Sequence, residues 1–225
     1  MWFLNIILEL IFPTKCISCS KYGTDFCQKC LSESRAPERE SAGWIFPIFD
    51  YRHPPIKKAL WLFKYKGKKR LAGIFAAVIY ERILEELSDL SVMENFNEPI
   101  LIPIPLSPKR YRERGYNQAE LICRELIKID NLHQGLAVEA NINIKLENNI
   151  LIKPKETEHQ ARIKDRKIRL KNLSDSFVVI NGELLKKRNI ILIDDITTTG
   201  ATLSEARSVL KRSGAREVIA FTVAH

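Results

Sequence analysis

Two kinds of hydrophobic pattern alternate along the chain, and together they predict an α/β fold. Continuous apolar runs bounded by polar or proline residues are typical of buried strands, and they occur at 45–51, 100–104, 149–153, 176–180, 190–193 and 218–223. Apolar residues at helical spacing predict helices at 56–63, 71–87, 116–129 and 202–212. Strands that alternate with helices in this way favour a parallel sheet flanked by helices.

The strand predicted at 190–193 ends in two adjacent carboxylates, Asp194 and Asp195, and a hydroxyl-rich loop follows them. With the next helix and the strand at 218–223, this segment forms a βαβ unit. Ligands of parallel sheets bind at the carboxyl ends of the strands. The two aspartates therefore fall where a ligand is expected.

The residue types in this loop fit a sugar that carries a 5′-phosphate. Asp194 and Asp195 can accept hydrogen bonds from vicinal ribose hydroxyls. The phosphate would lie in a cradle of hydroxyls and backbone N–H groups at the start of the helix, made by Thr197, Thr198, Thr199, Gly200, Ala201 and Thr202. The alternative is a loop that only satisfies its own backbone. No lysine follows the glycine, and further glycines are missing, so the loop is neither a Walker A motif nor a dinucleotide fingerprint.

A basic segment follows the strand at 100–104. Three prolines there precede a loop with four cations, Lys109, Arg110, Arg112 and Arg114. Their charge and reach suit phosphate groups, of a small ligand or of DNA. A solvated basic surface is the alternative.

Four of the five cysteines form two pairs, Cys16-x-x-Cys19 and Cys27-x-x-Cys30. Four thiolates at this spacing can bind Zn²⁺ tetrahedrally, and a closed set of four sulfur ligands indicates a structural site. A redox-active pair is the weaker alternative. Cys123 stands in an apolar helical pattern and is expected in the core.

Composition and charge set further bounds. The 225 residues are 45% hydrophobic and carry a net charge of +9, which favours anionic partners. We predict four parts: a short apolar helix at 1–13, a zinc module at 14–31, a linker at 32–43 and the main domain at 44–225. The first of these is too short to span a bilayer and lacks the features of a signal peptide. We therefore expect a cytoplasmic protein, with peripheral attachment to the inner membrane as the weaker alternative.

The segment at 191–203 resembles the 5-phosphoribosyl-1-pyrophosphate (PRPP) motif of type I phosphoribosyltransferases. The resemblance implies that fold, a ribose site at Asp194 and Asp195, a 5′-phosphate site at Thr197 to Thr202, and Mg²⁺ bound with PRPP. It also implies that the loop with Lys109, Arg110, Arg112 and Arg114 binds pyrophosphate. Enzymes of the hypoxanthine type carry an aspartate where this chain has Thr198, which disfavours hypoxanthine or guanine salvage.

The whole set of motifs resembles the ComF/ComFC family of competence-associated phosphoribosyltransferase-like proteins. The matching parts are the cysteine cluster, Lys64-Tyr65-Lys66-Gly67, the segment 102–106, Arg114-Gly115-Tyr116-Asn117-Gln118-Ala119, Thr157 with Gln160 and Arg166, and the segment 191–203. Lys155 departs from the family pattern, which has arginine there.

The family resemblance implies a role in handling single-stranded DNA during natural transformation. A competence helicase or a membrane channel would then be a partner of the amino-terminal helix. Aromatic residues among cations, such as Trp61, Tyr65 and Tyr111, suit a single-strand groove, although Trp61 and Phe63 are expected in the core. The alternative function is an active phosphoribosyltransferase for a nucleobase-like acceptor.

Overall fold

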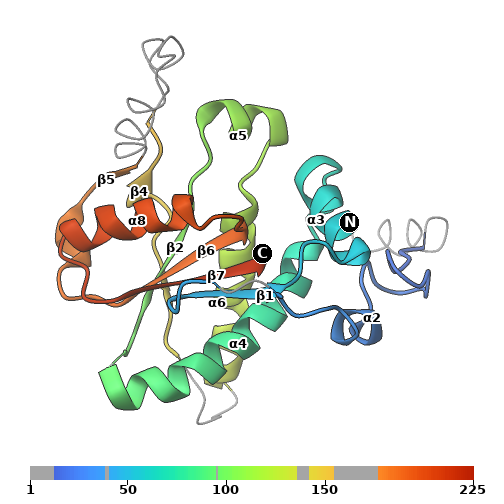
Figure 1. The fold of residues 1–225 in the computed structure, drawn as a ribbon, viewed down its shortest axis with the longest axis horizontal. Helices are drawn as coiled ribbons and strands as arrows, with labels where there is room; N and C mark the ends of the chain where they lie inside the picture. The colour runs from blue at the N-terminus through green and yellow to red at the C-terminus, as the bar shows by residue number, and fades with distance from the viewer. Residues whose placement is uncertain (1–12, 39–40, 95, 136–141, 155–176) are drawn as a thin grey trace.

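The computed structural model describes residues 13–38, 41–94, 96–135, 142–154 and 177–225. Their strands form a five-stranded parallel sheet in the order β1-β7-β6-β2-β3 and a two-stranded antiparallel sheet of β4 and β5 (Figure 1). The strands are β1 (Ile45–Phe49), β2 (Ile100–Pro103), β3 (Lys145–Leu146), β4 (Leu151–Ile152), β5 (Val178–Val179), β6 (Ile190–Ile196) and β7 (Val218–Ala224). The predicted parallel sheet flanked by helices is confirmed.

Helix α8 lies on one face of the large sheet, and α4 and α6 lie on the other (Figure 1). The described helices are α2 (Gln28–Ser32), α3 (Pro54–Tyr65), α4 (Leu71–Glu94), α5 (Pro108–Arg114), α6 (Gln118–Gly135), the 3₁₀ helix η3 (Gly182–Leu185) and α8 (Ala201–Arg212). None of the helices within the described ranges is both long and apolar enough to cross a membrane.

Strand β6 is the centre of the core because both of its faces are covered. Ile191 and Ile193 belong to the cluster that α4 and α6 complete, whereas Ile190 and Leu192 belong to the cluster that includes Leu203 of α8. This double burial explains why the run reads as continuously apolar. The first polar side chains, Asp194 and Asp195, follow this apolar run within the last three residues of the strand.

One sequence expectation needs correction. The segment with the four cations is not an open loop but the helix α5, which Ser107 caps by accepting a hydrogen bond from the Arg110 amide at 3.4 Å. Pro108 occupies the first turn, where proline is tolerated, and Gly115 ends the helix with φ +74°. The strands expected at 149–153 and 176–180 are confirmed, and they pair with each other in a separate two-stranded sheet.

The cysteine segment packs on the main domain. Cys16, Phe26 and Cys27 share one hydrophobic cluster with Phe63 of α3 and Phe75 of α4. The expected apolar helix at 1–13 lies outside the described residues except for its last residue, as do the motif residues at 155–166. The boundaries proposed between the module, the linker and the main domain remain predictions.

Candidate functional site

The two aspartates lie at the carboxyl end of β6, as the sequence predicted. Asp194 is in register with Thr222 of β7, and the Thr197 amide just beyond donates to the Ala224 carbonyl at 2.9 Å. Asp195 is 5% exposed, whereas Asp194 is half-buried. The neighbouring strand therefore holds the start of the threonine loop in place.

Different environments surround the two carboxyl groups. Burial raises the pKa of the Asp194 carboxyl to about 7, and the negative charge of Asp195 adds to the shift. The Asp195 backbone N–H donates to Asp194 Oδ1 at 2.8 Å and opposes this shift only in part. A hydroxyl-bearing ligand would thus meet one carboxyl that titrates near neutral pH beside one that is ion-paired.

Asp195 is paired with two cations that come from the ends of two different helices. Lys64 Nζ, in the last turn of α3, lies 2.9 Å from Asp195 Oδ1. Arg114 Nη1, at the end of α5, lies 3.9 Å from Asp195 Oδ2 and donates to Gln118 Oε1 at 2.9 Å. All three charged side chains are nearly buried, so screening by water is weak. Lys64 is not among the site residues predicted from sequence, although it belongs to the motif Lys64-Tyr65-Lys66-Gly67.

The threonine loop lines a pocket of about 590 Å³ next to the aspartates. Gly200 adopts φ +71° at the start of α8, a conformation that favours glycine, and an added Cβ would also crowd Ile45 Cδ1 at 3.2 Å. The pocket is lined by Thr197, Thr198, Thr199, Gly200 and Ser204 and, from elsewhere in the chain, by Ser41, Ala42, Ile45 and His225. Its hydroxyls and the positive end of α8 suit an anion.

Sequence reasoning missed the residues that reach this pocket from other segments. His225 Nε2 lies 2.8 Å from the Thr198 carbonyl oxygen, and its Nδ1 lies 3.3 Å from Ser41 Oγ. Ser41 had been assigned to a linker. The β1–β7–β6 strand order brings these residues to the loop, and no local sequence pattern predicts that order.

The four cations predicted at 109–114 separate into two groups. Arg114 joins the aspartates, whereas Lys109, Arg110 and Arg112 are exposed on α5, and no contact described in the structure links them to the aspartate pair. Arg112 lies in the same last turn as Arg114, but residues two positions apart point to different sides of a helix.

Three exposed aromatic side chains lie on α3 and α5, and two of them lie next to a cation. Trp61, Tyr65 and Tyr111 are 48%, 59% and 51% exposed. Lys66 Nζ lies 5.3 Å from the Trp61 ring centroid, and the Arg114 guanidinium carbon lies 5.6 Å from that of Tyr65. The expectation that Trp61 is a core residue is wrong, whereas the same expectation for Phe63 is confirmed.

The four clustered cysteines could hold a metal ion. Their sulfur atoms all lie within 4.8 Å of one another, and three of the four residues are buried. Burial opposes ionisation, but hydrogen bonds from nearby backbone amides, including that of Cys27, lower the pKa of the Cys16 thiol to about 6. A thiolate of this kind suits a metal. Helix α2 starts directly after Cys27, and the sequence did not predict this helix. Within the described residues, this helix is not part of a βαβ unit.

Cys123 is fully buried, as predicted.

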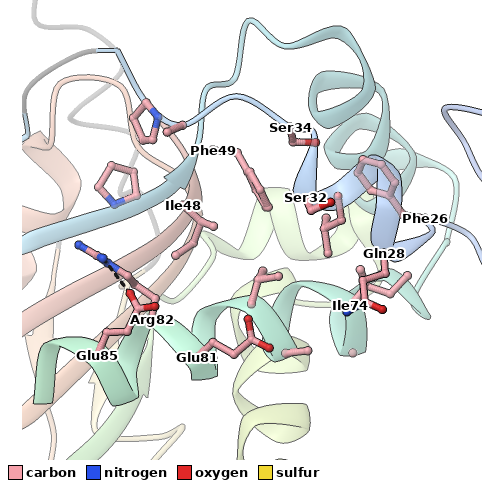
Figure 2. Close-up of a pocket in the computed structure, with 17 residues that line it drawn as sticks. Phe26, Gln28, Ser32, Ser34, Ile48, Phe49, Ile74, Glu81, Arg82 and Glu85 are labelled. Atoms are coloured by element: carbon pink, nitrogen blue, oxygen red, sulfur yellow. Dashed lines mark hydrogen bonds and ion pairs between the residues drawn. The ribbon is translucent and has the colours of Figure 1, made fainter. Parts of the chain in front are cut away.

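A larger cavity of about 820 Å³ lies away from the aspartates. Figure 2 shows its wall formed by Phe26 and Gln28 of the cysteine module, Phe49 of β1 and Arg82 of α4. Its lining includes no residue predicted from sequence to bind a sugar phosphate. The smaller pocket at the threonine loop is therefore the one that matches the predicted chemistry.

Comparison with known proteins points to one group of relatives, although no family model matches the chain. Competence protein ComFC of Streptococcus pneumoniae is 28% identical over 216 residues, which cover 96% of this chain and 82% of that protein. ComFC of Bacillus subtilis is 32% identical, over 75% of this chain and 59% of its own length. In sequence, this chain is similar to the ComF competence proteins.

The ComF relationship extends to proteins with another name. The DNA utilization protein YhgH of Escherichia coli K12 is 24% identical, over 85% of this chain and 74% of its own length. Among solved structures, hypoxanthine phosphoribosyltransferase of Trypanosoma cruzi is similar with a TM-score of 0.41 and 11% identity, over 68% of this chain and 64% of that one. The relatives confirm the ComF resemblance that the sequence motifs predicted.

Proposed function

We propose that this ComF relative binds PRPP, or a related 5-phosphosugar, with Mg²⁺ at the carboxyl end of β6. The observation that carries the proposal is the pocket lined by Thr197, Thr198, Thr199 and Gly200 directly beyond Asp194 and Asp195. The pocket would hold the 5′-phosphate, and the aspartates would accept hydrogen bonds from the ribose hydroxyls. Both groups of ligand atoms then find partners of matching chemistry within one short segment.

The two cations at Asp195 fit the remaining part of such a ligand. Lys64 and Arg114 are nearly buried and are paired with Asp195. When PRPP binds, its pyrophosphate would compete with Asp195 for these two cations and bind them. Charge-assisted hydrogen bonds to phosphate are strong where water is excluded. Lys109, Arg110 and Arg112 remain available for a longer polyanion on the exposed side of α5.

We further propose that the exposed aromatic and basic surface of α3 and α5 holds single-stranded DNA. Trp61, Tyr65 and Tyr111 offer stacking faces, and cations lie next to two of them. The names of the relatives, which refer to competence and DNA utilization, support this choice of polyanion. A structural Zn²⁺ at the four cysteines completes the proposal, and a competence helicase or membrane channel remains the proposed protein partner.

The alternative is an active phosphoribosyltransferase that uses the same pocket. Lys64 and Arg114 would then stabilise pyrophosphate as it leaves, and catalysis would come from positioning and from charge stabilisation of the sugar. Release of pyrophosphate from Mg²⁺-PRPP in the presence of a panel of nucleobases tests this directly. Sustained release that requires Asp194 and Asp195 would favour the enzyme over a binding protein.

Calorimetric titration of Mg²⁺-PRPP tests the binding proposal. We expect saturable binding to the unmodified protein and a loss of at least a hundredfold in the Asp194→Asn/Asp195→Asn variant. Glu183→Gln changes an exposed carboxylate on η3 and is the control, with unchanged affinity. Equal binding to the double variant and the unmodified protein, or no binding to either, would contradict the proposal.

A further inference from the structure

The turn between α3 and α4 links the cysteine module to the phosphosugar site. Before the turn, Lys64 Nζ lies 2.9 Å from Asp195 Oδ1. Four residues later, Lys68 Nζ lies 2.8 Å from Asp25 Oδ1 in the module. One short segment therefore carries two ion pairs, one to each region.

In the pair at the module, the carboxylate is buried, whereas the Lys68 side chain is 45% exposed. Asp25 is 3% exposed, so its carboxylate has lost most of its hydration and depends on Lys68. Removing the partner of a buried charge is strongly destabilising, since the charge stays buried without compensation. Two more hydrogen bonds join the same regions, from Arg70 Nη1 to Thr14 Oγ1 at 3.3 Å and from Lys58 Nζ to the Ile17 carbonyl at 3.2 Å.

Backbone hydrogen bonds within the turn hold Lys68 in a fixed position relative to the end of α3. The amides of Lys66 and Lys68 both donate to the Leu62 carbonyl, at 3.0 and 3.4 Å, and Gly67 adopts φ +66° between them. These bonds fix Lys68 relative to the last turn of α3. Since Lys64 lies in that turn, a change at Lys68 is expected to move Lys64.

A metal at the cysteines would strengthen the link between the module and the turn. The module has little core of its own, so a bound ion would supply much of its folding free energy. Asp25 lies two residues before Cys27, one of the four clustered cysteines. Order in the module thus determines where the Asp25 carboxylate stands.

We propose that the cysteine module positions Lys64 in the phosphosugar site by anchoring the α3–α4 turn through the Asp25–Lys68 ion pair. Asp25 and Lys68 are positioning residues, because they act through Lys64 and do not touch the aspartates. The ligand part of this inference rests on the proposed function. The structural part, order in the turn, does not.

Amide hydrogen exchange of the ligand-free protein tests the structural part. In Asp25→Asn and Lys68→Met we expect exchange at residues 66–72 to accelerate at least tenfold, and chelation of the metal should have the same effect. Lys68→Arg keeps the charge and should behave like the unmodified protein. Lys29→Met removes the lysine of an exposed pair within the module and is the control. Unchanged exchange in both Asp25→Asn and Lys68→Met would overturn the proposal.

Calorimetry with Mg²⁺-PRPP tests the link to Lys64. We expect Lys68→Met to weaken binding about five- to tenfold, and Lys64→Met/Lys68→Met to bind no more weakly than Lys64→Met alone. Additive losses in the double variant would contradict a route through Lys64. Metal content and thermal melting of each variant show whether the module is still folded. Absence of binding to the unmodified protein would refute the proposed function, whereas the exchange experiment would still decide the inference.

Discussion

Asp194 and Asp195 are adjacent in sequence, but their side chains have different surroundings. Asp195 is ion-paired with Lys64 and Arg114, whereas the main close partner of Asp194 is the backbone N–H of Asp195. Burial and the neighbouring charge therefore make ionisation of Asp194 costly. A ligand that donates hydrogen bonds to Asp194 would stabilise its ionised form and offset that cost. The site is therefore suited to bind hydroxyl groups.

The raised pKa of Asp194 predicts how stability depends on pH. A folded-state pKa of about 7, above the ordinary value of 3.8, means that the folded protein holds this proton more tightly than the unfolded chain. Stability should therefore fall as pH rises from about 4 to about 7, by at most about 1.4 kcal/mol per pH unit from this group, and then level off. Asp194→Asn should lose this contribution and be more stable than the unmodified protein at pH 8.

Urea unfolding at several pH values between 5 and 8 measures this effect. Glu113→Gln, which removes an exposed carboxylate on α5, is the control and should follow the unmodified protein. A constant difference in unfolding free energy between Asp194→Asn and the unmodified protein across this range would refute the assigned pKa shift.

At the scale of elements, the site is assembled where helices and strands end. The start of α8 and the last residues of β6 come from one continuous segment, and that continuity is why the sequence predicted them together. Lys64 and Arg114 come from the ends of α3 and α5, and their meeting at Asp195 depends on how these helices pack. No local pattern encodes such packing. The helix α5 was missed for a different reason, because Pro108 in its first turn, the prolines before it and its cations read as a loop.

The start of α8 depends on the left-handed backbone conformation of Gly200. Gly200→Ala forces a side chain into a left-handed conformation, at about 1–2 kcal/mol, and brings its Cβ to 3.2 Å from Ile45 Cδ1. We expect the unfolding free energy to fall by about 1–3 kcal/mol in urea unfolding, together with weaker binding of PRPP.

Gly73→Ala is the matched control, because Gly73 lies inside α4 with its nearest neighbour, Glu125 Oε2, 3.8 Å from an added Cβ. Alanine is the better helix former, so this variant should be unchanged or more stable by up to about 1 kcal/mol. Equal effects of the two substitutions would show that the backbone of Gly200 is not special.

At the scale of the whole molecule, a chain with net charge +9 carries exposed aromatic and basic side chains on α3 and α5, and one of these cations, Arg114, also contacts Asp195. The aspartate pair and the surface on α3 and α5 share Arg114, which lies 3.9 Å from Asp195 and next to the Tyr65 ring, so the pyrophosphate of a small ligand and a strand of DNA would compete for the same guanidinium. The composition alone predicted an anionic partner, but only the fold separates the exposed Trp61 and Tyr65 from the buried Phe63.

Binding of oligothymidylate should therefore depend strongly on salt and on the aromatic residues. The logarithm of affinity should fall with the logarithm of salt concentration by about 0.7 for each phosphate neutralised. Trp61→Ala and Tyr65→Ala should each weaken binding about tenfold or more, since a stacked base contributes about 1–3 kcal/mol.

Tyr22→Ala is the control for the oligothymidylate measurement. Tyr22 is also exposed and also lies near a cation, Lys15, but it belongs to the cysteine module, so this variant should bind normally. Fluorescence anisotropy measures all of these affinities. Binding that is insensitive to salt, or equally sensitive to all three aromatic substitutions, would count against the proposed surface.

The most direct test of the central claim is a crystal structure of this protein grown with Mg²⁺ and PRPP. We predict electron density for the 5′-phosphate within the loop from Thr197 to Thr202, and for the ribose hydroxyls at Asp194 and Asp195. Lys64 should have moved from Asp195 toward the pyrophosphate. Ligand density only in the larger cavity between the cysteine module and α4, or no ligand density at saturating PRPP, would contradict the account.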